Sequence, residues 1–256
     1  MSLARYLEAT AYDAAFWLSA FTNPDYPVDQ LGQVCVDSCA KLRTLAIISL
    51  VEQGRHQAFT HNLVRSGRCR QSFLQRLQAS GQADRHDASS RIEPFFDAVA
   101  AADFALARQI VALSPRDWRK GHEYEDDYCH AQIAHAVLAP VADVARTQSL
   151  FERWETVLDG QPDARLPVLR ALVQRDVDGF DAAFEGLVQA HTDALDAERA
   201  RARIEEYDVI ALRQLYVEGL ALLRMATQLR LKTQAEYRYC PSLARQTSPV
   251  ALPAEW

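Results

Sequence analysis

The chain has 256 residues, of which 49 % are apolar, with a net charge of −6 and only nine glycines. A chain of this length buries a substantial core without needing disulfides or metals. Alanine and leucine are abundant while valine and isoleucine are scarce, which is typical of helices and not of sheets. The acidic balance also argues against bulk affinity for nucleic acid, because that binding needs basic side chains facing phosphates. Sheet-based enzymes and nucleic-acid-binding proteins are therefore disfavoured.

The sequence contains neither a clear targeting signal nor a cysteine pattern typical of disulfides. The N-terminus lacks the pattern of a signal peptide, and no run of about 18 apolar residues is present to cross a membrane. We therefore expect a soluble, cytoplasmic protein without a membrane segment. The five cysteines are odd in number and lie mostly in helical patterns, so we expect reduced thiols packed in the core. Cys35 and Cys39 have the spacing C-x3-C, but no second close pair of ligands accompanies them, which favours packing over a metal site.

Helical periodicity begins with an amphipathic segment over residues 3–21, which Asn23-Pro24-Asp25 ends. The run 37–51 is apolar nearly all round, as in a central buried helix. The next segment, about 57–78, carries several arginines away from its apolar stripe, and a solvated helix face is the default interpretation. Gly67 within this segment predicts a break or kink.

Residues 80–90 contain no large apolar side chain and form the most loop-like stretch before the C-terminal tail. We expect one all-helical domain over 1–256. Any sub-boundary should fall in this loop, which would then separate N-terminal helices (1–79) from a helical core (91–243) and a tail (244–256).

The rest of the chain also has helical periodicity. Further helices are predicted at about 92–101, 103–113, 123–139, 143–158, 165–174, 180–205 and 209–231. The resulting nine or ten helices indicate an all-α protein built as an irregular multi-helix bundle. The helix–Asp–helix rhythm of 96–113 is similar to that of 169–188, so stacked helical hairpins are the alternative, although no regular repeat is present.

The densest cluster of chemistry-bearing side chains lies at residues 122–130. Its four acids are Glu123, Glu125, Asp126 and Asp127. Acids in the first turn stabilise the positive end of a helix, which accounts for two of them. The excess predicts a basic partner, either within the fold or on another protein. Inside the chain, the candidates are the arginines of the 57–78 segment, in particular Arg65 and Arg68.

Catalytic signatures are missing from the sequence. No nucleophile elbow, phosphate loop or zinc-protease motif occurs. Asp127 and His130 have helical i,i+3 spacing, but no histidine follows a glutamate by three residues, as a di-iron bundle requires. A metal-dependent hydrolase would need Asp126, Asp127, His130 or His135 to converge on one ion. We therefore expect no metal, no cofactor and no enzymatic activity, and a binding protein is favoured.

Two stretches of the chain resemble a known family. Residues 103–108, Leu113-Ser114-Pro115, Trp118 and 123–127 look like the central motif of the immunity protein 49 family, which are predicted immunity proteins of bacterial polymorphic toxin systems. Residues 216–224 and 236–242 are similar to the closing helix and tail of that family. The first 90 residues add only helical character to this resemblance.

The resemblance implies an all-helical cytoplasmic protein, without enzymatic activity, that binds and neutralises an effector toxin of a contact-dependent or type VI secretion system. The toxin-facing surface would include Trp118, Glu123, Tyr124, Glu125, Asp126 and Asp127. The acids would then steer association and the aromatic rings would supply burial.

Other interpretations remain open at the level of the sequence. In one, Trp118 packs into the core while the acids cap a helix and pair with Arg65 or Arg68. A helical-repeat adaptor without a toxin partner and a metal-dependent helical hydrolase are alternative functions. The sequence leaves open which toxin is bound and which oligomeric state the protein adopts.

Overall fold

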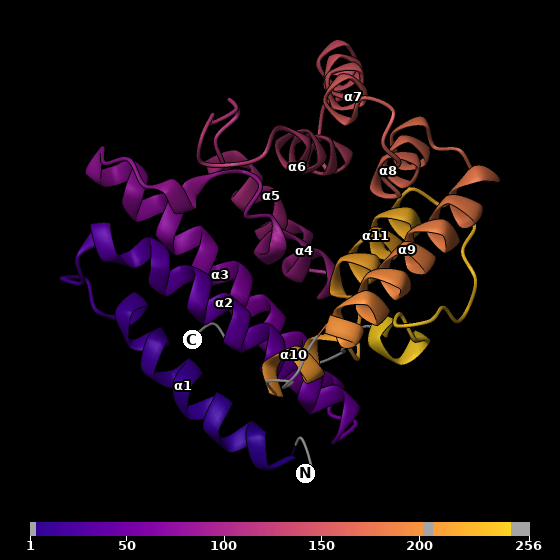
Figure 1. Ribbon diagram of the computed structural model, residues 1–256. Helices are drawn as coiled ribbons and strands as arrows, with labels where there is room; N and C mark the ends of the chain where they lie inside the picture. The colour runs from indigo at the N-terminus through magenta and orange to yellow at the C-terminus, as the bar shows by residue number, and fades with distance from the viewer. Residues whose placement is uncertain (1–3, 202–206, 247–256) are drawn as a thin grey trace.

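A computed structural model describes residues 4–201 and 207–246, and helices account for most of them (Figure 1). The α-helices are α1 (Ala4–Thr22), α2 (Val28–Val51), α3 (His56–Ser80), α4 (Glu93–Ala100), α5 (Phe104–Leu113), α6 (Glu125–Val137), α7 (Val144–Leu158), α8 (Arg165–Gln174), α9 (Gly179–Arg201), α10 (Tyr207–Leu212) and α11 (Val217–Gln228). Two short 3-10 helices are η1 (Arg85–Asp87) and η2 (Ser242–Arg245). No strand occurs in these two ranges, so the prediction of an all-α multi-helix bundle is confirmed.

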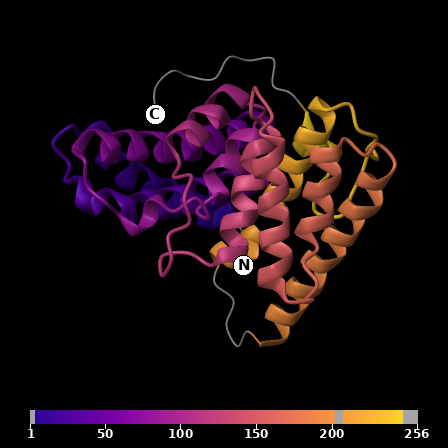
Figure 2. The ribbon, with the colours of Figure 1, turned by 90° about the horizontal axis from the view of Figure 1, so that it is seen from above.

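The helices form two groups that meet at α4. Helices α1, α2 and α3 lie side by side, whereas α6 and α7 run across their direction (Figures 1 and 2). Helix α4 packs against α3 and α5, and it also packs against α11. Helix α6 packs against α7 and α8, and α9 packs against α8 and α11. Successive helices thus pair as hairpins, but their directions change from pair to pair.

One hydrophobic cluster extends from α1 to η2 and includes side chains on both sides of the 80–90 loop. Its large members include Trp154 of α7 and Phe95 of α4, which have no exposed surface. Helix α2 carries Leu42 and Ala46 with no exposed surface, as predicted for a central buried helix. It begins at Val28, earlier than the apolar run at 37–51 indicates, because Leu31 continues the buried face across polar neighbours.

Helix α3 runs unbroken through Gly67, so the prediction of a break at this position is wrong. A Cβ atom at Gly67 would lie 2.8 Å from Cδ2 of Leu106 and 3.2 Å from Cβ of Ala98. The glycine therefore lets α4 and α5 approach the α3 backbone closely, and this packing requirement explains its place inside a helix.

The predicted helix at 209–231 is also wrong, because the chain forms two helices, α10 and α11, in that region. Between them the backbone N–H of Tyr216 donates to the carbonyl oxygen of Tyr239 at 2.9 Å. A long-range hydrogen bond thus replaces a helical one at this point, and no local pattern reveals it. Residues 202–205 of the predicted 180–205 helix, and 247–256 of the predicted tail, lie outside the described residues.

The 80–90 loop is held against the fold by Arg70 of α3. This buried guanidinium donates to the carbonyl oxygens of His86, Asp87 and Ala88, with distances of 2.8 Å to Asp87 and 2.9 Å to Ala88. Three carbonyl groups of one loop are thereby satisfied by one side chain.

Arg76 of α3 holds the connection between α1 and α2 in the same way. Its guanidinium donates to the carbonyl oxygens of Ala20, Asn23, Pro24 and Tyr26 at 2.5–3.3 Å. The interpretation of the 57–78 arginines as a solvated face is therefore wrong for Arg70 and Arg76, which fasten helix connections.

The five cysteines are free and buried, so their prediction as core thiols is confirmed. Burial raises the pKa of Cys129 to about 11 and that of Cys240 to about 12, which disfavours their thiolates at neutral pH. None of the described helices is long and apolar enough to cross a bilayer.

Candidate binding surface

The acidic cluster lies where the α5–α6 loop enters α6. Gly121 has a positive φ of 85°, and Lys120 and Glu123 form an isolated β-bridge around it. Helix α6 therefore begins at Glu125 and not at Glu123 as predicted. Glu123 lies in the turn before the helix and therefore does not share a face of α6 with Asp127.

Glu123 joins two loops through its carboxylate. Oε2 accepts a hydrogen bond from the backbone N–H of Ser90 at 3.0 Å, and Oε1 accepts one from that of Arg119 at 3.1 Å. A carboxylate that accepts two backbone N–H groups forms charge-assisted hydrogen bonds on both sides. Glu123 thus fixes the end of the 80–90 loop to the loop before α6.

Glu125 pairs with Arg153 of α7. The Nε of Arg153 lies 2.6 Å from Oε1 of Glu125. The guanidinium carbon of Arg153 also lies 5.1 Å from the centre of the Trp118 ring and 5.2 Å from that of Tyr128, distances at which cation–π attraction acts. One arginine therefore connects α7, the start of α6 and the preceding loop.

Asp126 and Asp127 face Arg165 of α8. The Nη1 of Arg165 lies 2.8 Å from Oδ1 of Asp127, and its Nη2 lies 3.5 Å from Oδ2 of Asp126. Nη2 also lies 2.7 Å from Oδ2 of Asp163. Burial disfavours the charge of Arg165, but the hydrogen bonds that it donates to Asp163 and Asp127 outweigh burial and raise its pKa.

The arginines that pair with the acids thus come from α7 and α8, and the expected pairing with Arg65 or Arg68 is wrong. The physical reason is the packing of α6, which contacts α7 and α8, whereas α3 packs against α2, α4 and α5. Arg65 instead donates to Oδ1 of Asn62 at 3.5 Å. Arg153 and Arg165 stand singly in the sequence, so no local charge pattern indicates their role.

The two aromatic residues of the predicted surface have different environments. Trp118 is partly buried, and its Nε1–H donates to the carbonyl oxygen of Glu123 at 3.4 Å. Tyr124 is 79 % exposed, and its side chain makes no hydrogen bond or ring contact with another described residue. Trp118 therefore supports the loop, while the Tyr124 ring is free to contact another molecule.

Two surface hollows border this segment. One, of about 670 Å³, is lined by Trp118, Arg119 and His122 among others. The other, of about 630 Å³, is lined by Tyr124, Asp127 and residues of the 90–93 segment. Tyr124 therefore stands at the edge of a concave surface, the shape that a protruding partner group can occupy.

The four residues that a metal-dependent hydrolase would require have separate neighbours. Asp126 and Asp127 face Arg165, as described above. The Nε2 of His130 lies 3.2 Å from Oε1 of Glu218, and the ring centre of His135 lies 4.7 Å from that of Phe95. Within residues 4–201 and 207–246, no group of three or more His, Cys, Asp or Glu side chains is placed to hold a metal ion.

Comparison with protein families supplies an independent result. The family model described as immunity protein 49 matches residues 43–244, from the middle of α2 to η2, and thus most of the chain. Comparisons with curated proteins and with solved structures gave no significant match. The matched range includes the whole surface around Tyr124 and all the helices that support it. The chain belongs to the immunity protein 49 family.

Proposed function

We propose that this protein is a cytoplasmic immunity protein that binds an effector toxin and neutralises it by direct contact, without catalysis. Membership of the immunity protein 49 family supports a protein toxin as the partner. The proposed toxins are those of polymorphic systems, including effectors of type VI secretion. Tight protein interfaces are commonly centred on aromatic or arginine anchors, and complementary charge speeds association.

The observation that carries the proposal for a toxin-binding surface is the exposed ring of Tyr124 beside an excess of acids. Around Arg153 and Arg165 stand Glu125, Asp126, Asp127 and Asp163. Four carboxylates and two guanidinium groups leave two net negative charges. The side chains of the three helical acids keep 28–39 % of their surface exposed, so they can attract a basic partner.

The six residues of the proposed surface have different roles. Tyr124 is the anchor that contacts the toxin, and Glu125, Asp126 and Asp127 steer its approach. Glu123 and Trp118 act as positioning residues, because Glu123 ties the two loops together and Trp118 packs under Arg153. Substituting Glu123 or Trp118 should therefore reduce stability as well as affinity.

The partner for the test is the variable C-terminal domain of a large secreted protein encoded beside this chain. That domain should be toxic when expressed alone and harmless with this protein. Tyr124→Ala should weaken its binding by about tenfold or more, as expected for a central aromatic anchor, without lowering the free energy of unfolding. The matched control is Tyr12→Ala on α1, because Tyr12 is 73 % exposed but lies on another helix. Equal affinity of the two variants would refute the assignment of Tyr124.

The charge contribution is tested by the rate of association. Asp126→Asn with Asp127→Asn should slow association and reduce its dependence on ionic strength. The control pair is Asp193→Asn with Asp196→Asn, on the exposed side of α9. Thermal melting of both double variants separates loss of steering from loss of folding. An association rate that does not change with Asp126 and Asp127 would contradict a basic toxin surface.

A further inference from the structure

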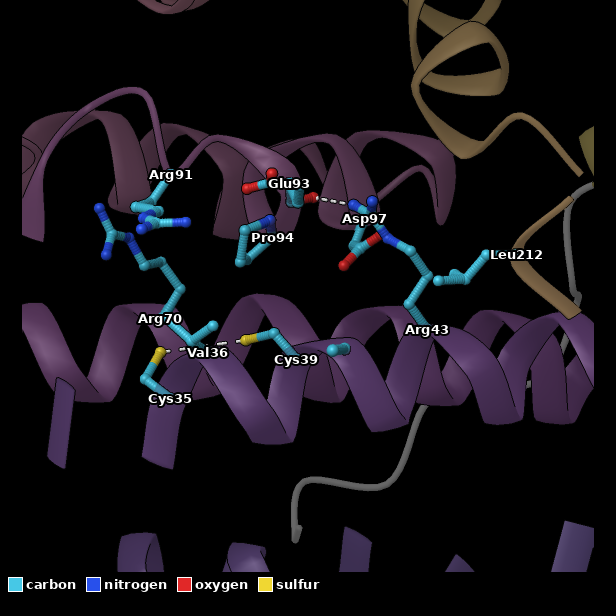
Figure 3. Close-up of a pocket in the computed structure, with 11 residues that line it drawn as sticks. Cys35, Val36, Cys39, Arg43, Arg70, Arg91, Glu93, Pro94, Asp97 and Leu212 are labelled. Carbon is cyan, nitrogen blue, oxygen red and sulfur yellow. Dashed lines mark hydrogen bonds and ion pairs between the residues drawn. The ribbon is translucent and has the colours of Figure 1, made fainter. Parts of the chain in front are cut away.

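A separate cavity of about 270 Å³ lies between α2, α3 and the beginning of α4, with Leu212 of α10 at one end (Figure 3). Its walls carry three arginines and two acids together with apolar side chains such as Val36 and Pro94. Arg91 and Glu93 also line the hollow beside Tyr124, whereas Arg43, Arg70 and Asp97 line this cavity and not that hollow.

Two of the five charged groups neutralise each other. The Nε of Arg43 lies 2.7 Å from Oδ1 of Asp97, whose side chain is fully buried. The Ser66 hydroxyl donates to the other oxygen of Asp97, and Arg43 also donates to the carbonyl oxygen of Glu93 at 2.6 Å. This pair is saturated by protein groups and leaves no net charge toward the cavity.

The other two arginines lack a carboxylate partner. Arg70 is 2 % exposed, its two terminal nitrogens donate only to backbone carbonyls, and its buried Nε has no acceptor. Arg91 is exposed and forms no ion pair with a described side chain. In Figure 3 the guanidinium groups of Arg70 and Arg91 stand at the same end of the cavity. Burial lowers the pKa of Arg70 although Asp87 and Glu93 partly offset that effect, so an anion at this end of the cavity would stabilise the buried charge.

The number of charges limits the anion. Glu93 is the one further acid on the cavity wall, so Arg70 and Arg91 together with Glu93 leave a single positive charge. The thiol of Cys39, also on the wall, donates to the carbonyl oxygen of Ser66 at 3.3 Å. A monoanion balances the site, whereas a dianion would leave an excess negative charge beside Glu93.

We propose that this cavity binds the carboxylate of a small organic acid. The carboxylate would accept from the unpartnered Nε–H of Arg70 and from the guanidinium of Arg91, and the hydrocarbon part would contact Val36, Pro94 and Leu212. This inference concerns a different class of ligand from the proposed toxin, although Arg91 and Glu93 line both this cavity and the hollow beside Tyr124.

Titration calorimetry of the full chain with butyrate, at constant ionic strength set by sodium chloride, tests the proposal. Arg91→Gln should weaken butyrate binding by about tenfold or more, as expected for loss of a charge-assisted hydrogen bond. The matched control is Arg108→Gln on α5, which is exposed like Arg91 and should leave binding unchanged. Ala40→Leu, at an exposed wall position of α2, should abolish binding by filling the cavity while both arginines remain.

Further ligands decide the chemistry and its source. Inorganic phosphate should bind more weakly than butyrate, and a stronger phosphate signal would overturn the assignment to a monocarboxylate. Glutamate capped at both backbone ends represents an acidic side chain of a partner protein. A free organic acid is supported if butyrate binds better than capped glutamate, and a protein side chain is supported by the reverse order. Binding that is equal in Arg91→Gln and wild type, with both folded by circular dichroism, would refute the site.

Discussion

The Nε of Arg153 lies 2.6 Å from Oε1 of Glu125, and the same guanidinium stacks over the ring of Trp118. This arrangement ties α7 to the first turn of α6 and to the loop before it. The acids at the start of α6 therefore form ion pairs within the fold, in addition to any contact with a partner. The strength of these contacts can be measured as the change in the free energy of unfolding when each arginine is replaced.

Replacing Arg153 by alanine should lower the free energy of unfolding by about 1 kcal/mol, the sum of one partly exposed ion pair and cation–π contacts. Arg153→Lys should recover part of that loss, because an ammonium group keeps the charge but not the flat stacking surface. Urea denaturation measures both changes, with Arg108→Ala on α5 as the control. A stability equal to that of wild type would show that the Glu125 pair contributes nothing.

Arg70→Lys should destabilise the protein by about 2–4 kcal/mol, because a lysine cannot donate to three carbonyl groups and leaves buried acceptors unsatisfied. The loss follows from the contacts of Arg70 with the carbonyl oxygens of residues 86–88. Limited proteolysis should then cut within 80–90 earlier than in wild type. Arg76→Lys, whose carbonyl partners are partly exposed, is the comparison and should cost less. Identical cleavage of the 80–90 loop in wild type and Arg70→Lys would contradict this role.

Gly67→Ala should lower the free energy of unfolding by about 1–3 kcal/mol, the usual cost of overpacking. The added methyl group would meet Leu106 at 2.8 Å. Gly186→Ala is the matched control, because Gly186 lies in α9 with nothing within 4 Å of its Cβ position. That substitution should stabilise the protein by up to about 1 kcal/mol through helix propensity. Equal effects of the two substitutions in chemical denaturation would argue against close packing at Gly67.

Acid should destabilise the protein through His135. Burial, with smaller effects of Arg70 and His130, lowers the pKa of His135 to about 3 from 6.5. His135 has a lower pKa in the folded state than in the unfolded state. Its contribution to the free energy of unfolding is therefore complete above the unfolded pKa of about 6.5, and it is lost as the pH falls toward 3. Its contribution should fall by about 1.4 kcal/mol for each pH unit within that window.

His135→Met removes this titration while keeping a buried apolar side chain beside Phe95. As the pH falls from 6 to 4, the free energy of unfolding of the variant relative to that of wild type should therefore rise by about 1.4 kcal/mol per pH unit. Asp97, whose pKa burial raises to about 6, acts with the opposite sign, since its contribution falls as the pH rises from about 4 to 6. Comparing the two proteins at each pH cancels the effect of Asp97. A constant difference between their unfolding free energies would contradict the prediction for His135.

Local sequence patterns predict much of this fold. The apolar run at 37–51 lies in a buried helix, and the segments 144–158 and 165–174 are helical as their periodicity and breakers indicate. Asp103 caps the N-terminus of α5, because its side chain accepts a hydrogen bond from the N–H of Leu106 at 3.0 Å. These features involve residues a few positions apart, so composition and spacing are sufficient to find them.

The sequence by itself determined an all-helical protein with a cluster of acids around the start of α6 and, through its motifs, the immunity protein 49 family. Only the tertiary structure decided which arginines pair with those acids. Arg153 and Arg165 are 28 and 38 positions from their partners, and the packing of α6 on α7 and α8 brings them together. Tertiary structure also leaves Tyr124 exposed, and the packing of α4 against α3 places Arg70 and Arg91 at the same end of one cavity. Charge contacts between distant helices depend on how those helices pack, and a local charge pattern carries no information about that geometry.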